Sequence, residues 1–189
     1  NAVLKSTKEG GEGADYDFDS STVEFYGVTF DSSAHSGSYP GYARLTGTYK
    51  DCVFKGQYTC YQDSKFDYCT FDITGDKYNL WTWGAPNVTM DHCTFNCDGK
   101  AVLLYGTANT NLTIKNTVFN DNDGIDPEKT AVEIGNDYNK SYTLTLTNVE
   151  ANGFDENPNG IATGTTLWSN KNSMGTDKLN VVVNGTDVY

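Results

Sequence analysis

The stretch NVTMDHCTFN at residues 87–96 returns 24 residues later as NLTIKNTVFN at residues 111–120. In both copies apolar and polar residues alternate, one residue interrupts the alternation, and a second short run ends on Phe before an Asn. Such alternation is typical of a β-strand with one buried side. A repeat of this length indicates units that bury their apolar faces only against neighbouring units.

Six segments along the chain share this pattern, and their last residues are separated by 24, 17, 24, 24 and 32 residues. These segments end at Phe30, Phe54, Phe71, Phe95, Phe119 and Ala151. The interrupting residue is usually Gly, Asn, Asp or His, which tolerate a left-handed backbone better than other types do. We therefore predict one-residue bends, with Tyr68 the least suited residue, at Gly27, Asp51, Tyr68, His92, Asn116 and Asn148.

A third apolar run precedes most copies, at residues 79–84, 101–106, 131–135 and 165–169. Three short strands and three bends in a repeat of about 24 residues predict one rung of a parallel β-helix. The strand residues are mostly Thr, Val, Tyr, Phe and Leu, and Gly, Asn and Asp mark the bends. We expect an all-β solenoid of about six to seven rungs over residues 22–189. Residues 1–21 form an N-terminal cap or a disordered lead-in.

Five cysteines are present, and Cys52, Cys69 and Cys93 occupy the same position in three successive repeats. Side chains on adjacent parallel strands point the same way, which suits a disulfide poorly. We therefore predict a column of buried, reduced thiols. The spacing of Cys93 and Cys97 permits a zinc site on paper, but the repeat explains these residues better, and we predict no metal and no cofactor.

The chain carries 25 acidic and 13 basic residues, for a formal net charge of −12. This charge repels phosphate groups, so we expect no nucleic-acid partner and no binding to anionic membranes. No apolar run approaches the roughly 20 residues of a membrane span, so we expect no membrane insertion.

The sequence offers little for catalysis. Arg44 is the only arginine, and its segment YPGYARLTG contains no acidic residue. Glycosidases use two carboxyl groups that face each other across a cleft, and we expect no pair of carboxylates at matching positions of successive repeats. The acidic stretch NDNDGIDPEKT departs from the spacing of a calcium-binding loop, so we interpret it as a solvated turn. We predict no catalytic residues, with a polysaccharide lyase or hydrolase as the alternative.

Aromatic residues offer the best candidate binding site. Trp83, Tyr105, Ile134 and Trp168 align in successive repeats, and Trp81 lies two residues before Trp83. If this side of the strand points inward, these residues are core. If it points outward, they form a strip suited to sugar rings, because ring faces stack and polar edges form hydrogen bonds. The tentative ligand-binding residues are thus Trp81, Trp83, Tyr105 and Trp168.

The pattern NVTMDHCTFN, with YNLWTWGAPNVTM overlapping it at residues 78–90, resembles the pectin-lyase-like β-helix domains of large surface proteins in Gram-positive gut bacteria. The resemblance covers about residues 22–189 and implies a right-handed parallel β-helix. It also implies an adhesive or stalk role, an extracellular or cell-surface location, and membership of a larger surface protein. We therefore expect a noncatalytic adhesive module that binds an extended glycan or a host surface protein, with a structural spacer as the second alternative.

Overall fold

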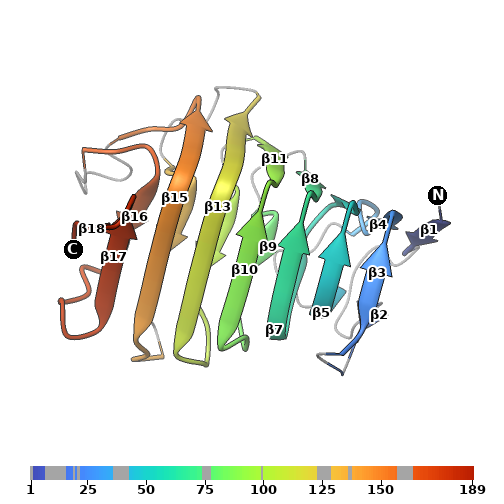
Figure 1. The fold of residues 1–189 in the computed structure, drawn as a ribbon, viewed down its shortest axis with the longest axis horizontal. Coiled ribbons are helices and arrows are strands. Elements are labelled where there is room, and N and C mark those ends of the chain that lie inside the picture. The colour runs from blue at the N-terminus through green and yellow to red at the C-terminus, as the bar shows by residue number, and fades with distance from the viewer. Residues whose placement is uncertain are drawn as a thin grey trace.

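The computed structural model describes residues 2–6, 16–18, 20, 22–35, 43–73, 78–98, 100–122, 129–135, 138–156 and 164–189. These parts of the chain contain 18 strands and no helix. The strands form one large sheet whose pairs are parallel, except that β17 and β18 pair antiparallel. The prediction of an all-β protein with parallel strands is confirmed (Figure 1).

The strands vary from two residues to the 12 residues of β13. Their bounds are β1 Ala2–Lys5, β2 Tyr16–Asp17, β3 Glu24–Tyr26, β4 Val28–Asp31, β5 Ala43–Lys50, β6 Val53–Lys55, β7 Tyr58–Asp67, β8 Thr70–Asp72, β9 Leu80–Trp81, β10 Asn87–Asp91, β11 Thr94–Cys97, β12 Val102–Leu104, β13 Thr110–Asp121, β14 Val132–Ile134, β15 Tyr142–Asn152, β16 Trp168–Asn170, β17 Leu179–Val183 and β18 Thr186–Asp187.

The parallel pairings form three series, which we call ladders. Ladder A joins β3, β10, β17 and parts of β5, β7, β13 and β15. Ladder B joins β1, β4, β6, β8, β11 and the C-terminal parts of β13 and β15. Ladder C joins β2, β9, β12, β14, β16 and the N-terminal parts of β5 and β7. Figure 1 looks onto ladder A, with the N-terminal strands on the right and the C-terminal strands on the left.

A left-handed residue separates ladder A from ladder B in each repeat. All six predicted bend residues have a positive φ: Gly27 63°, Asp51 54°, Tyr68 52°, His92 52°, Asn116 47° and Asn148 52°. Tyr68, the least suited type, stacks its ring on that of His92, with centroids 4.6 Å apart and planes 10° apart. This contact offsets part of the cost that a bulky residue incurs in the left-handed region.

A column of phenylalanines runs through the core behind ladder B. Phe30, Phe54, Phe71, Phe95 and Phe119 are fully buried, and consecutive ring centroids lie 4.4 to 5.1 Å apart. Their planes are nearly parallel, at 4° to 23°. Because each buried Phe contributes about 1.5–3 kcal/mol, this column is a main source of stability. It also confirms the predicted stacking of Phe95 between Phe71 and Phe119.

The predicted cysteine column is also present. Cys52, Cys69 and Cys93 are buried free thiols, as are Cys60 and Cys97. Each member of the column accepts a hydrogen bond from the next repeat, since the amide groups of Thr70, Thr94 and Val118 donate to the carbonyl oxygens of Cys52, Cys69 and Cys93. In the following repeat the column continues at Thr117, whose Oγ1 accepts a hydrogen bond from the Cys93 amide at 3.2 Å.

Irregular repeat lengths are absorbed on both sides of ladder C, in the connections from ladder B and in those to ladder A. In the shortest interval the chain turns at Gly56, with a φ of 96°, and a Cβ there would lie 2.9 Å from the carbonyl oxygen of Ser32. Only glycine fits this close approach. Part of the longest interval, residues 123–128, lies outside the described residues.

The N-terminal segment takes part in the sheet. β1 pairs with β4 and β2 pairs with β5, so the described parts of residues 1–21 cover the first edge of ladders B and C. Residue 1 and the Gly-rich residues 7–15 lie outside the described residues.

The cysteine column generates a stability prediction. Replacing Cys93 by Asp places a carboxylate at a site where the native side chain is 2% exposed. We expect a loss of about 3 kcal/mol or more in the free energy of unfolding, because a buried carboxylate without a partner is costly. Chemical denaturation followed by circular dichroism measures the change.

Cys93→Thr is the matched control, because Thr117 holds the same position one repeat later and donates its hydroxyl to the Lys115 carbonyl oxygen at 2.7 Å. We expect this variant to lose much less stability than Cys93→Asp. A Cys93→Asp protein as stable as the parent contradicts the stacked arrangement.

Candidate functional site

Three of the four predicted aromatic residues lie on the outer side of ladder C. Leu80, Val102 and Leu104 point into the core and are fully buried. The alternation of the strand therefore directs Trp81, Trp83 and Tyr105 away from the core, and all three are partly exposed. The outward orientation, left open by the sequence, is the one that the structure shows for these residues.

Trp168 lies elsewhere, and its predicted alignment with Trp83 and Tyr105 is wrong by three positions. It pairs with Val132, which pairs with Val102, so it stands in the inward column. Its side chain is 5% exposed and belongs to the core. The cause is a later turn in this repeat, where the Asn170 side chain holds the backbone of Met174 by two hydrogen bonds of 2.9 Å.

Two tyrosines that the repeat pattern missed complete the aromatic group. Tyr78 lies 6.1 Å from Trp81 between ring centroids, and Tyr138 lies 5.4 Å from Trp83 and 5.6 Å from Tyr105. We call Tyr78, Trp81, Trp83, Tyr105 and Tyr138 the aromatic cluster. Both added residues lie in connections outside the repeated pattern, so the sequence carried no positional signal for them.

The rings of the aromatic cluster meet at steep angles. Trp81 is inclined at 81° to Tyr78 and at 84° to Tyr105, and Tyr138 is inclined at 86° to Trp83. Gly135 leaves room for this arrangement, because a Cβ there would lie 3.2 Å from Cδ2 of Tyr105. Tyr138 is the outermost member, with 45% of its surface exposed.

A buried acidic residue lies beneath the aromatic cluster. Glu133 pairs with Leu103, which pairs with Trp81, so all three belong to the outward column of ladder C. Glu133 is nevertheless only 1% exposed, and its carboxyl group accepts a hydrogen bond from the Tyr78 hydroxyl. The signal in the sequence is the single charged residue in the apolar run AVEIG, and Glu133 was not among the predicted site residues.

Lys100 places a positive charge against the same cluster. Its Nζ lies 5.6 Å from the centroid of the Tyr78 ring, within the range of a cation–π interaction. Tyr78 is thus in contact with an ammonium group at its ring face and with a carboxyl group at its hydroxyl.

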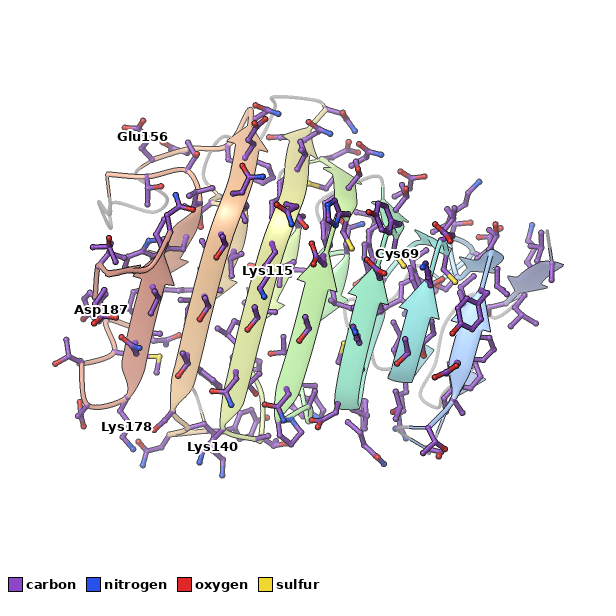
Figure 2. The ribbon with its side chains drawn as sticks, viewed as in Figure 1. Cys69, Lys115, Lys140, Glu156, Lys178 and Asp187 are labelled. Carbon is purple, nitrogen blue, oxygen red and sulfur yellow. The ribbon has the colours of Figure 1, made fainter. Side chains whose placement is uncertain are left out.

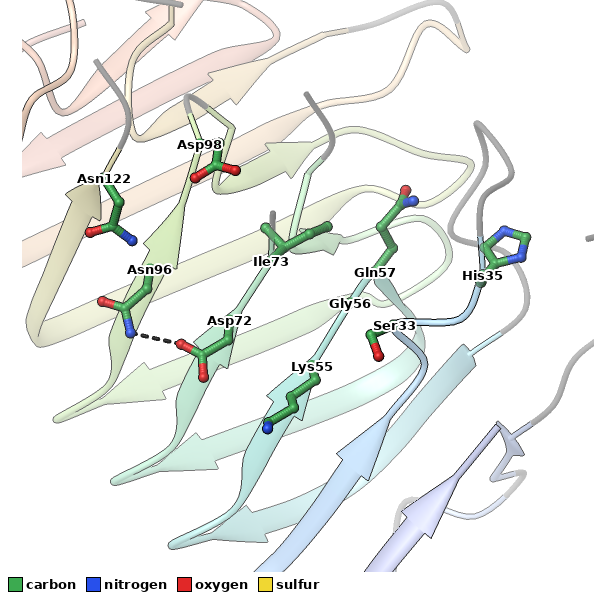
Figure 3. A pocket seen from close by; sticks show the side chains of 10 residues that line it. All are labelled: Ser33, His35, Lys55, Gly56, Gln57, Asp72, Ile73, Asn96, Asp98 and Asn122. Atoms are coloured by element: carbon green, nitrogen blue, oxygen red, sulfur yellow. Dashed lines mark hydrogen bonds between the residues drawn. The ribbon is translucent and has the colours of Figure 1, made fainter. Parts of the chain in front are cut away.

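A polar pocket of about 480 Å³ lies where ladder B gives way to ladder C (Figure 3). Its lining comes from five successive repeats, and we call it the corner pocket; the residues are Ser33, His35, Lys55, Gly56, Gln57, Asp72, Ile73, Asn96, Asp98 and Asn122. Asp98 lines this pocket, and Lys100, two residues further on, lies over Tyr78. Asp98 and Lys100 thus link the corner pocket to the aromatic cluster along the chain.

A row of side-chain hydrogen bonds borders the corner pocket. Asn96 donates to Asp72 at 2.7 Å, Asn120 donates to Asn96 at 3.2 Å, and Asn152 donates to Asn120 at 3.1 Å. Each amide spans two repeats, which fixes these polar groups in a row. The sequence places these residues directly after the Phe column, but their alignment was not interpreted as a site.

A pair of carboxylates does occupy matching positions, contrary to the prediction. Asp67 and Asp91 are in register on ladder A, flanked in the same row by Lys50 and Lys115. Lys115 projects outward from β13 in Figure 2. Both aspartates precede a bend residue by one position, so an alignment on the bends reveals the pair.

Asp91 is tied to its neighbours, and the arginine lies elsewhere. Its Oδ1 accepts a hydrogen bond from Asn116 at 2.8 Å and lies 2.9 Å from Nδ1 of His92. Arg44 belongs to ladder C, where its guanidinium lies 4.3 Å from the Tyr61 ring centroid. The structure therefore does not bring the arginine and the paired carboxylates together.

In the described ranges, no group of three or more His, Cys, Asp or Glu side chains is arranged to hold a metal ion. The central part of the acidic stretch, residues 123–128, lies outside these ranges. No helix in the described part of the chain is long and apolar enough to cross a membrane.

The chain was also compared with known proteins. No protein-family model, no curated protein and no solved structure matches it.

Buried thiols give a prediction for this part of the molecule. Burial raises the pKa of the Cys60 thiol to about 12, so this residue is protonated near neutral pH. Because the thiolate is the reactive form, and all five cysteines are buried, we expect slow reaction with Ellman's reagent in the native protein. In denaturant all five thiols should react at once. Fast reaction of the native protein contradicts the buried arrangement.

Proposed function

We propose that the chain is a right-handed parallel β-helix that serves as a noncatalytic module for binding an extended glycan. Three ladders of parallel strands with a repeat near 24 residues support the β-helix. The right-handed coil, the extracellular setting and membership of a larger bacterial surface protein follow from the resemblance to pectin-lyase-like domains.

The observation that carries the binding function is the aromatic cluster beside the corner pocket. Partly exposed Trp and Tyr rings offer apolar faces to a sugar. The pocket adds side-chain amides and carboxyl groups that can bond hydroxyl groups, and its volume of about 480 Å³ is in the range of ligand sites. Five repeats at about 4.8 Å spacing extend over about 19 Å, which favours several linked sugar units over a single one.

The net charge of the protein favours some classes of glycan over others. With a net charge of −12, the domain repels polyanions at long range. Lys55 is a positive group in the corner pocket, where it stands with Asp72 and Asp98. A neutral or partly cationic polysaccharide therefore fits better than a uronate polymer.

Titration with soluble neutral and amino-substituted polysaccharides tests this proposal through tryptophan fluorescence. We expect a saturable change with at least one glycan. Trp83→Ala should weaken binding about fivefold, since one stacked ring contributes about 1 kcal/mol. Asp98→Ala should also weaken it, because Asp98 lines the corner pocket.

The matched control is Lys115→Ala, an exposed residue on ladder A, which should leave binding unchanged. Binding that is insensitive to both Trp83→Ala and Asp98→Ala places the ligand elsewhere. Binding to a host glycoprotein that survives enzymatic removal of its glycans overturns glycan recognition in favour of a protein partner. No binding to any ligand favours the structural spacer.

A second candidate function, polysaccharide cleavage, draws on the Asp67–Asp91 pair. Adjacent parallel strands set equivalent residues about 4.8 Å apart, close to the separation of carboxyl groups in retaining glycosidases. Against this, Asp91 is bonded to Asn116, the pair lies in a row with lysines, and Arg44 lies on another ladder.

We expect no catalysis. Incubation with pectin, polygalacturonate, alginate or neutral glycans, with calcium present, should release neither unsaturated products nor reducing ends. Asp67→Asn and Asp91→Asn variants provide the check. Turnover that either variant abolishes establishes the cleavage function and contradicts the noncatalytic proposal.

A further inference from the structure

The carboxyl group of Glu133 is buried where the fold does not require an acid. Its equivalents in neighbouring repeats are Leu103 and Ser169. Among the described residues, its carboxyl group has one hydrogen-bond partner, the Tyr78 hydroxyl. Burial of an acidic group with so few partners is costly, and a positive charge brought beside it offsets that cost.

The ring geometry of the aromatic cluster suits a compact cation. Besides offering faces on which a sugar can stack, these rings meet at 81° to 86° in three of their contacts. Rings at right angles direct several π-faces toward one region, which favours a small positive group that interacts with more than one face. Buried pairs in the core also meet steeply, as Phe54 and Phe66 do at 83°, so what distinguishes this cluster is that its rings are partly exposed beside a buried acid.

Lys100 shows that the cluster accepts a cation. Its ammonium group lies over Tyr78, the residue whose hydroxyl bonds Glu133. The chain thus already combines an ammonium group, an aromatic face and a carboxyl group at this place. The net charge of −12 further favours positive ligands over negative ones.

From these observations we infer that the aromatic cluster recognises an organic ammonium group, such as an amino or trimethylammonium substituent, carried by the glycan. The inference rests on the proposed function for its setting, but the cation site itself can be tested without any glycan. The cation lies against the exposed faces of Trp83, Tyr105 and Tyr138, and Glu133 supplies the opposite charge. Lys100, whose ammonium group lies over Tyr78 of the same cluster, opposes the binding of a second cation by like-charge repulsion.

Choline chloride is the probe, and 3,3-dimethylbutan-1-ol, which has the same shape without the charge, is the matched control. Both are titrated at constant ionic strength while tryptophan fluorescence is recorded. We expect saturable binding of choline with a dissociation constant of about 10 mM or below. The neutral alcohol should bind at least about tenfold more weakly.

Three variants locate the site. Glu133→Gln keeps the shape and a hydrogen-bond acceptor for Tyr78, and should weaken choline binding about tenfold without loss of thermal stability. Tyr138→Ala removes the most exposed ring and should also weaken it. Lys100→Met removes the repelling ammonium group and should strengthen it.

Each outcome is decisive. Equal binding of choline and the neutral alcohol, or choline binding unaffected by Glu133→Gln and Tyr138→Ala, overturns the cation site. Failure of choline to bind also overturns it, even if neutral glycans bind, and the proposed function then stands alone. Choline binding in a protein that binds no glycan supports the cation site and contradicts the glycan proposal.

Discussion

One backbone constraint holds the rest of the structure in register: a single left-handed residue between ladders A and B in every repeat. A non-glycine residue in this conformation costs about 1–2 kcal/mol, and five of the six predicted bends are non-glycine. Because the bend recurs at the same place, every position before and after it stacks on its equivalent. The Phe column and the cysteine column are results of that stacking, and their burial offsets the cost of the bends. A slip of one residue would turn Phe95 outward and Thr94 inward.

The same constraint sets what the outer surface can display. Each outward position repeats along the axis, so the surface consists of rows, such as the amides of Asn96, Asn120 and Asn152. A uniform row offers the same groups at every repeat and has little means to select one ligand. Selectivity requires a departure from the row. The departures occur on ladder C and in the connections that precede and follow it, where repeat length varies and Tyr78, Lys100 and Tyr138 enter.

The difference between the repeated positions and the irregular connections explains which features could be predicted from the sequence. The bends, the Phe column and the buried thiols follow from periodicity, since one repeat predicts the next. Trp168 was placed wrongly because its repeat turns at Met174 rather than at a glycine. Tyr78 and Tyr138 belong to connections without periodicity, so only three-dimensional contacts bring them to Trp81 and Trp83. The Asp67–Asp91 pair also follows from periodicity, since both residues directly precede a bend, and the prediction that no such pair exists was wrong.

The fold does not require an acidic residue at the position of Glu133. A leucine at this position, as at Leu103 one repeat earlier, would bury apolar surface and avoid the desolvation of a carboxyl group. The bends and the core columns make no use of the acid, because its side chain belongs to the outward column of ladder C with Leu103 and Trp81. A residue that lowers stability without serving the fold is most simply explained by an interaction made with something else. Tyr78, which bonds Glu133 through its hydroxyl and carries the Lys100 ammonium group over its ring, indicates positive charge as the complementary chemistry. On the inference made above, the cost of the buried acid in the free domain is offset when a cation binds.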